Sequence, residues 1–199
     1  MINKLGWKIG GEQGEGLEST AEIFSTVINT LGYHMYSTRD FASRIKGGHS
    51  NSKICISEER INVIDYKTDI LIAFDQATLD SYIPELDENS IIIADAKIKP
   101  EISEEIKGLV AVFPITDLAK EIANPIIKNI ITLGICSALL DIDSKIFYDM
   151  IEAKFSSKGE EIVNTNIQAF DKGREIMNDF MAENNINDKY YLKKLNPTH

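Results

Sequence analysis

A glycine-rich segment, Gly10-Gly11-Glu12-Gln13-Gly14-Glu15-Gly16, constrains the fold of this chain more than any other feature of its sequence. Four glycines within seven residues exclude a helix interior, because glycine loses more backbone freedom on folding than any other residue. The apolar-rich run 5–9 precedes the segment, and apolar residues at three- and four-residue spacing follow it over 17–31. The sequence therefore predicts a strand, a tight loop and a helix in succession, with Gly32 ending the helix.

The remaining pattern predicts an α/β fold. Nearly continuous apolar runs at 69–75, 90–95 and 109–113 are typical of strands that are covered on both faces. Further strands are expected at 33–38 and 51–57, the latter with a hairpin partner at 61–64, and helices at 76–82, 117–123, 126–140, 144–155 and 160–180. We expect a three-layer α/β/α fold with a mostly parallel sheet and a helical C-terminal layer. The domain should span 1–181, with a polar tail or interdomain linker at 182–199.

Charge and cysteine content exclude several classes of protein. The net charge of −10 argues against a duplex nucleic-acid binder, since such proteins neutralise phosphates with clustered Lys and Arg. Cys55 and Cys136 lie among apolar residues and are expected to be buried, and two cysteines are too few for an ordinary iron–sulfur cluster. With no apolar run long enough to span a membrane and no leader pattern, we expect a cytoplasmic protein.

The glycine loop does not match either common nucleotide motif. A phosphate-binding loop of the Walker type needs Lys where this chain has Leu17, and a dinucleotide fingerprint needs Gly or Ala where it has Ser19. We therefore expect weak or no binding of NAD, ATP or GTP, and the glutamates of the loop oppose free nucleotides further. Two interpretations remain open: a turn that needs glycine for backbone reasons only, or a loop that contacts a ligand or partner.

A second segment, Ser43-Arg44-Ile45-Lys46-Gly47-Gly48-His49-Ser50-Asn51, concentrates positive charge. Arg presents a planar fork of donors to phosphate or carboxylate, and Lys presents a point charge. The two glycines allow a ligand or a neighbouring backbone to approach closely. A solvated loop with ordinary surface cations is the alternative. No second His or Cys lies at ligand spacing from His49, so no metal site is expected.

These two segments, in this order, resemble the gamma domain of 2-oxoacid:ferredoxin oxidoreductases. Three later segments fit the same resemblance, which extends over about residues 4–180: Asp69-Ile70-Leu71-Ile72-Ala73-Phe74-Asp75, Asn129-Ile130-Ile131-Thr132-Leu133-Gly134 and Asn166-Ile167-Gln168-Ala169-Phe170-Asp171-Lys172-Gly173. Gly-Glu-Gly and Arg-Ile-Lys-Gly-Gly-His are most similar to the type in which this domain opens the alpha subunit, often one acting on 2-oxoglutarate. In that type a thiamine-associated domain follows, whereas this sequence stops at His199, so we expect a fragment or a separate gamma chain. Because the tail resembles the interdomain linker of the family, we favour a fragment.

The resemblance implies a non-catalytic role within a complex. The family oxidatively decarboxylates a 2-oxoacid with coenzyme A, using thiamine diphosphate, magnesium and iron–sulfur clusters, and passes electrons to ferredoxin. We expect this chain to hold none of these cofactors alone, to have other oxidoreductase chains as partners, and to favour 2-oxoglutarate over pyruvate. By position, the resemblance implies that the residues helping to enclose coenzyme A or the active-site region are Gly11, Gly14, Gly16, Arg44, Lys46, Gly47, Gly48 and His49. The alternatives are an independent small-molecule-binding module that uses the glycine loop, and an assembly scaffold whose loops meet only protein.

Overall fold

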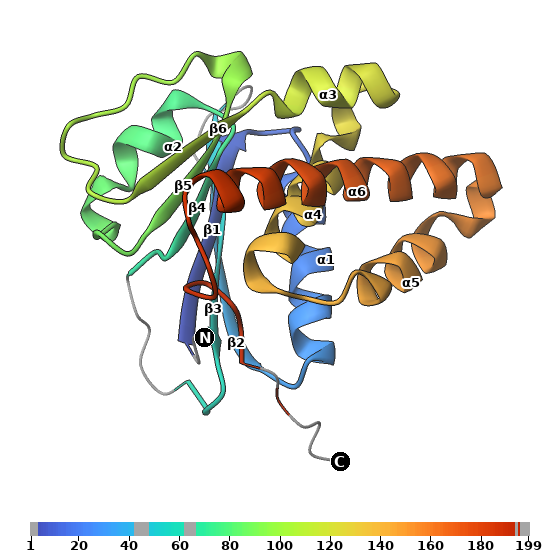
Figure 1. The fold of residues 1–199 in the computed structure, drawn as a ribbon, viewed down its shortest axis with the longest axis horizontal. Coiled ribbons are helices and arrows are strands. Elements are labelled where there is room, and N and C mark those ends of the chain that lie inside the picture. The colour runs from blue at the N-terminus through green and yellow to red at the C-terminus, as the bar shows by residue number, and fades with distance from the viewer. Residues whose placement is uncertain (1–3, 42–47, 62–66, 194, 196–199) are drawn as a thin grey trace. The chain divides into compact units, whose positions relative to one another are not determined.

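The computed structural model describes residues 4–41, 48–61, 67–193 and 195 (Figure 1). The chain divides into two compact units. One consists of Asn3–Pro114 with Leu195–His199, and the other of Ile115–Lys194 with Met1–Ile2. The first unit carries the sheet and the second is helical, so each is described by itself.

The described residues of the first unit form a six-stranded sheet in the order β2-β3-β1-β4-β5-β6. The strands are β1 Lys4–Glu12, β2 His34–Phe41, β3 His49–Ser57, β4 Ile70–Ala73, β5 Ile91–Asp95 and β6 Leu109–Phe113. Strands β1, β4, β5 and β6 pair in parallel, whereas β3 is antiparallel to both β1 and β2. Only β3 therefore runs against the other described strands, which confirms the prediction of a mostly parallel sheet.

Helices cover both faces of this sheet (Figure 1). Helix α1, Leu17–Thr30, packs on the face that carries Trp7, whose ring stacks on Phe24 with centroids 4.7 Å apart. Helix α2, Gln76–Ser81, and the short helix η1, Ile83–Glu85, lie over the opposite face, where Lys8 meets the ring of Tyr82. The arrangement follows from strand geometry, since successive side chains of β1 point to opposite faces. Another short helix, η2 Ala96–Ile98, follows β5.

The second unit contains α3 Ile115–Ile122, η3 Pro125–Ile127, α4 Lys128–Leu140, α5 Ser144–Phe155, η4 Ser156–Lys158 and α6 Glu160–Glu183. Helices α4 and α6 cross at two glycines. A Cβ on Gly134 would overlap the carbonyl oxygen of Phe170, and a Cβ on Gly173 would overlap that of Ile131. The missing side chains let the two backbones approach each other directly.

The structure confirms the predicted order of elements and corrects some boundaries. The polar stretch 39–50 is not all loop, because β2 continues to Phe41 and β3 begins at His49. Both extensions are held by backbone pairing in the sheet, which depends little on side-chain polarity. The predicted hairpin partner at 61–64 lies mostly outside the described residues. The segment predicted as a polar tail is partly packed, since Tyr190 and Leu192 are buried.

Candidate functional site at the ends of β1 and β4

Two neighbouring parallel strands lead to helices on opposite faces of the sheet. β1 continues into α1 on one face, and β4 continues into α2 on the other. Open α/β sheets bind ligands in the crevice that forms at the carboxyl ends of such strands, because the two connections diverge there. The glycine loop lies at this point in the fold, so its position is the first structural reason to regard it as a site.

The glycine loop needs glycine for its backbone conformation at two positions. β1 runs through Gly10 and Gly11 to Glu12, after which Gly14 has φ +93° and Gly16 has φ +79°. Side chains with a Cβ rarely adopt such angles. Gly16 is also the N-cap residue of α1, and as a glycine it has no side chain with which to cap the helix. The first backbone N–H groups of a helix have no partners within the helix, so these donors are left at the mouth of the loop.

A hollow of about 390 Å³ lies beside the loop, lined by Gln13, Gly14, Gly16, Leu17, Glu18, Ser19 and Ser50. It brings residues of the loop and of the first turn of α1 next to the start of β3. Glu18 stands in this first turn, 3.9 Å from Arg39 of β2, and both side chains are largely exposed. The hollow therefore combines the first backbone N–H groups of α1 with the negative charge of Glu18, which Arg39 offsets only in part.

The loop also contains a carboxylate that binds its own backbone. Glu15 Oε2 accepts a hydrogen bond from the Glu12 N–H at 3.0 Å. A Cβ on Gly11 would lie 2.5 Å from the same oxygen and 2.9 Å from Cβ of Phe74. Gly11 thus leaves room for Glu15 to fold back, and one donor of the loop is satisfied internally.

The two segments singled out in the sequence are joined in space. Glu12 pairs with His49 and Gly11 with Ser50 across β1 and β3. The Gln13 N–H donates to the Gly48 carbonyl at 3.1 Å, which extends the pairing beyond the end of the strand. Of the predicted site residues, the structure brings together Gly11, Gly14, Gly16, Gly48 and His49. Arg44, Lys46 and Gly47 lie outside the described residues.

Both ring nitrogens of His49 have protein partners. Nδ1 lies 3.1 Å from Asp75 Oδ2, and Nε2 lies 3.1 Å from the hydroxyl of Tyr82. Sequence reasoning missed both partners as site residues. The sequence could have pointed to Asp75, because it directly follows a buried strand, at the carboxyl end where α/β sheets bind ligands. No feature of the sequence pointed to Tyr82.

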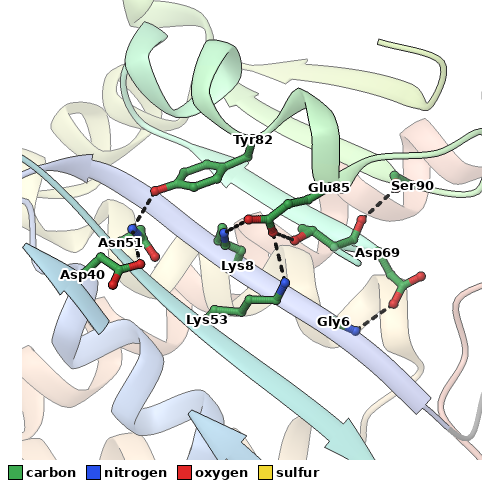
Figure 2. Close-up of polar contacts among 10 residues, drawn as sticks. Gly6, Lys8, Asp40, Asn51, Lys53, Asp69, Tyr82, Glu85 and Ser90 are labelled. Carbon is green, nitrogen blue, oxygen red and sulfur yellow. Dashed lines mark hydrogen bonds and ion pairs between the residues drawn. The ribbon is translucent and has the colours of Figure 1, made fainter. Parts of the chain in front are cut away.

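A buried polar network continues from Tyr82 along the same face of the sheet (Figure 2). Glu85 accepts from Lys8 at 2.6 Å and from Lys53 at 3.0 Å, and Thr68 donates to it at 2.5 Å. Lys8 Nζ also lies 3.6 Å from the centroid of the Tyr82 ring. Two ammonium groups that are almost fully buried thus share a single carboxylate.

Burial and charge shift the pKa values of these groups. Burial lowers the pKa of Lys8, against the opposing effect of Glu85. Burial on its own raises the pKa of Glu85, but hydrogen bonds from Lys8, Thr68 and Lys53 outweigh it and hold the pKa below its usual range. Burial, with the charges of Asp40, Glu85 and Asp75, raises the pKa of Tyr82 to about 12. The Tyr82 hydroxyl therefore keeps its proton at neutral pH and can donate it.

Two further features concern cofactors and membranes. Within the ranges that the structure describes, no three His, Cys, Asp or Glu side chains are grouped so as to hold a metal ion. Cys55 and Cys136 are both buried, as predicted, and lie in different units of the chain. None of the described helices combines the length and apolar character that crossing a membrane requires.

Comparison with known proteins agrees with the motifs. Residues 6–176 match the family described as pyruvate ferredoxin/flavodoxin oxidoreductase. A 2-oxoacid:ferredoxin oxidoreductase subunit alpha from Sulfolobus sp is 28% identical over 193 residues, covering 76% of this chain and 30% of that protein. The 2-oxoglutarate synthase subunit KorC from Methanocaldococcus jannaschii is 30% identical over 142 residues, covering 70% of this chain and 75% of that subunit.

Solved structures share the fold. A 2-oxoglutarate:ferredoxin oxidoreductase from Magnetococcus marinus, with 2-oxoglutarate, coenzyme A and succinyl-CoA bound, aligns with a TM-score of 0.88 at 23% identity, covering 99% of this chain and 34% of that one. A keto/oxoacid ferredoxin oxidoreductase gamma subunit from Geobacter sulfurreducens PCA aligns with a TM-score of 0.72 at 23% identity, covering 88% of this chain and 99% of that subunit.

The coverage differs between the two kinds of relative. The chain spans about a third of the length of the Sulfolobus alpha subunit, but three-quarters of KorC and nearly all of the Geobacter gamma subunit. A region similar to this chain thus lies within a long alpha subunit and makes up most of KorC, and the same fold makes up a gamma subunit. The resemblance seen in the sequence is confirmed, and this chain belongs to the pyruvate ferredoxin/flavodoxin oxidoreductase family.

Proposed function

We propose that this chain is the gamma-type domain of a 2-oxoacid:ferredoxin oxidoreductase, and that the crevice at the ends of β1 and β4 helps to enclose coenzyme A. The observation that carries the proposal is the meeting of the two sequence segments at this crevice, through the Gln13–Gly48 hydrogen bond of 3.1 Å. A phosphate group fits such a place because the first N–H groups of α1 have no partners within the helix and the helix dipole favours an anion at that end. Arg44 and Lys46 would supply the charge that the loop lacks.

The reaction of the assembled enzyme is oxidative decarboxylation of a 2-oxoacid to an acyl-CoA, with electrons passed to ferredoxin. We favour 2-oxoglutarate over pyruvate because KorC is a 2-oxoglutarate synthase subunit. Thiamine diphosphate, magnesium and iron–sulfur clusters would belong to the partner chains. This chain would contribute surface and shape to the complex, and no step of the chemistry is assigned to its side chains.

The test is an enzyme assembled from this chain and its thiamine-binding and cluster-binding partners. We expect coenzyme A-dependent reduction of a viologen dye with 2-oxoglutarate, and slower reduction with pyruvate or 2-oxoisovalerate. Faster turnover of pyruvate would overturn the preferred substrate.

Protection of the glycine loop is a second measurement in the same enzyme. We expect coenzyme A to slow amide hydrogen exchange in residues 13–19, compared with enzyme that lacks coenzyme A. If exchange does not change, the loop is a scaffold that meets only protein. Tight binding of a small molecule by the lone chain would instead favour an independent binding module.

A further inference from the structure

A single imidazole is held at both nitrogens by the two residues that flank α2. Asp75 precedes the helix and caps it, with Oδ1 accepting from the Thr78 N–H at 2.8 Å and from the Thr78 hydroxyl at 2.5 Å. Its other oxygen, Oδ2, faces Nδ1 of His49 at 3.1 Å. Tyr82 follows the helix, and its hydroxyl faces Nε2 of the same ring at 3.1 Å. The His49 side chain, which is 23% exposed, therefore bridges the start of β3 and both ends of α2.

The hydrogen bonds of this bridge have a defined direction. An ionised carboxylate only accepts, so Asp75 requires the proton of a neutral His49 ring to be on Nδ1. Nε2 is then an acceptor, and the protonated hydroxyl of Tyr82 donates to it. Asn51 completes the chain, because its Nδ2 donates to the Tyr82 oxygen at 2.6 Å. Every hydrogen-bonding position of the imidazole is thus used within the protein.

The bridge is linked directly to the glycine loop. His49 follows Gly48, whose carbonyl accepts from the Gln13 N–H. The ring also lies against Gly10 of β1, where a Cβ would be 3.2 Å from His49 Cε1 and 2.5 Å from the Thr78 hydroxyl oxygen. Glycine at position 10 therefore leaves the space in which His49 and α2 meet.

We propose that His49 is a positioning residue that fixes the glycine loop, and that it does not itself contact the ligand. The ring, held by Asp75 and Tyr82, sets the position of the Gly48 carbonyl, and this carbonyl sets the position of Gln13 and the loop that follows. The inference rests on the proposed function, since it assigns the residue that shapes the same crevice. Ligand contact is then left to the loop backbone.

The first experiment measures the loop in the purified chain. Tyr82→Phe removes one hydroxyl but keeps the ring that packs on Lys8, and Tyr36→Phe is the matched control on an exposed tyrosine of β2. We expect Tyr82→Phe to speed amide exchange at Gln13 about fivefold, the effect of losing one ordinary hydrogen bond. Exchange within β4 should not change.

Asp75→Asn should act at the other nitrogen and weaken the preference of the imidazole for the Nδ1–H form in ¹⁵N spectra. Unchanged Gln13 exchange in both variants would overturn the proposal.

The second experiment separates this inference from the proposed function. In the assembled enzyme, Tyr82→Phe should raise the KM for coenzyme A several-fold and leave kcat unchanged, because a displaced loop weakens binding without touching the reacting atoms. Faster Gln13 exchange with an unchanged KM would uphold the positioning role and count against a coenzyme A site here. A changed KM with unchanged Gln13 exchange would support the site and overturn the positioning role.

Discussion

At the scale of single residues, the glycines of the loop differ in why a side chain is excluded. At Gly14 the reason is conformational, because φ is +93° and, beyond its two chain neighbours, no atom of the described residues lies within 4 Å of the place that a methyl group would occupy. At Gly11 the reason is steric, since an added Cβ would clash with the side chains of Glu15 and Phe74. The two kinds of constraint have different consequences for stability and for function.

The substitution Gly14→Ala should lower the free energy of unfolding by about 1–2 kcal/mol, the cost of a left-handed conformation for a residue with a Cβ. In the assembled enzyme it should also weaken coenzyme A binding, because the strained loop shifts. Gly159→Ala is the matched control, at a positive φ of +105° far along the sequence from the loop. Urea unfolding and the KM for coenzyme A check both effects, and equal KM values for the two variants would contradict the site.

Arg44 and Lys46 are expected to serve the ligand or a partner carboxylate and not the fold. Arg44→Ala and Lys46→Ala should change the free energy of unfolding by only about ±0.5 kcal/mol, as exposed substitutions usually do. Loss of a charge-assisted contact in the complex should cost about 1.5–3 kcal/mol, which is roughly ten- to a hundredfold in coenzyme A dependence or assembly affinity. Arg60→Ala, at an exposed cation outside the segment, is the control. If Arg44→Ala or Lys46→Ala strongly lowers the melting temperature of the isolated chain, the segment serves the fold instead.

At the scale of elements, close packing and shared charge hold neighbouring segments together. Helices α4 and α6 approach through Gly134 and Gly173, so their contact is made by backbone atoms. On the sheet, β1, β3 and η1 are connected by Lys8, Lys53 and Glu85 (Figure 2). Each contact depends on residues that lie far apart in the sequence.

The helix crossing predicts a stability effect opposite to helix propensity. Alanine normally favours a helix over glycine by about 1 kcal/mol. At Gly134 and Gly173 the added methyl would overlap a facing carbonyl, so each Gly→Ala change should instead destabilise by about 1–3 kcal/mol. Asn178→Ala, on the exposed side of α6, should be close to neutral. Urea unfolding of the three variants would show the contrast, and a stabilised Gly134→Ala would contradict the crossing.

Glu85 predicts a pH-dependent contribution to stability. Glu85→Gln leaves Lys8 and Lys53 buried without their carboxylate, which should cost about 3–5 kcal/mol near neutral pH. The pKa of Glu85 is lowered in the folded state, so its contribution is present above the unfolded pKa and is lost as the pH falls through the folded pKa. The difference between wild type and Glu85→Gln in chemical denaturation should therefore shrink on acidification below about pH 4.5. Glu88→Gln, at an exposed site three residues along the chain, is the matched control.

At the scale of the whole molecule, the proposed chemistry depends on other chains. The only two cysteines are buried in different units, and the relatives that share this fold are named as subunits. We predict no turnover by the isolated chain with pyruvate or 2-oxoglutarate, coenzyme A and a viologen dye. Activity that persists after contaminants are removed would contradict the proposed division of labour.

The sequence by itself determined the order and type of the elements. The apolar runs that became β4 and β5 are covered on both faces, and the spacing of Leu17, Ala21 and Phe24 produced the buried side of α1. These features depend on local periodicity and on the backbone preferences of glycine, which can be read from neighbouring residues alone. The two candidate segments were found for the same reason.

Only the tertiary structure decided how these segments work together. The pairing of β1 with β3 placed Gly48 against Gln13, and the glycine loop and Ser50 of β3 line one hollow beside this pairing. His49 was predicted as a site residue, but the hydrogen bonds that occupy its ring come from residues 26 and 33 positions away. Such contacts depend on strand order and on the face that each helix covers. Neither strand order nor helix placement can be predicted from a local sequence pattern, because sheet pairing joins residues that are distant in the chain.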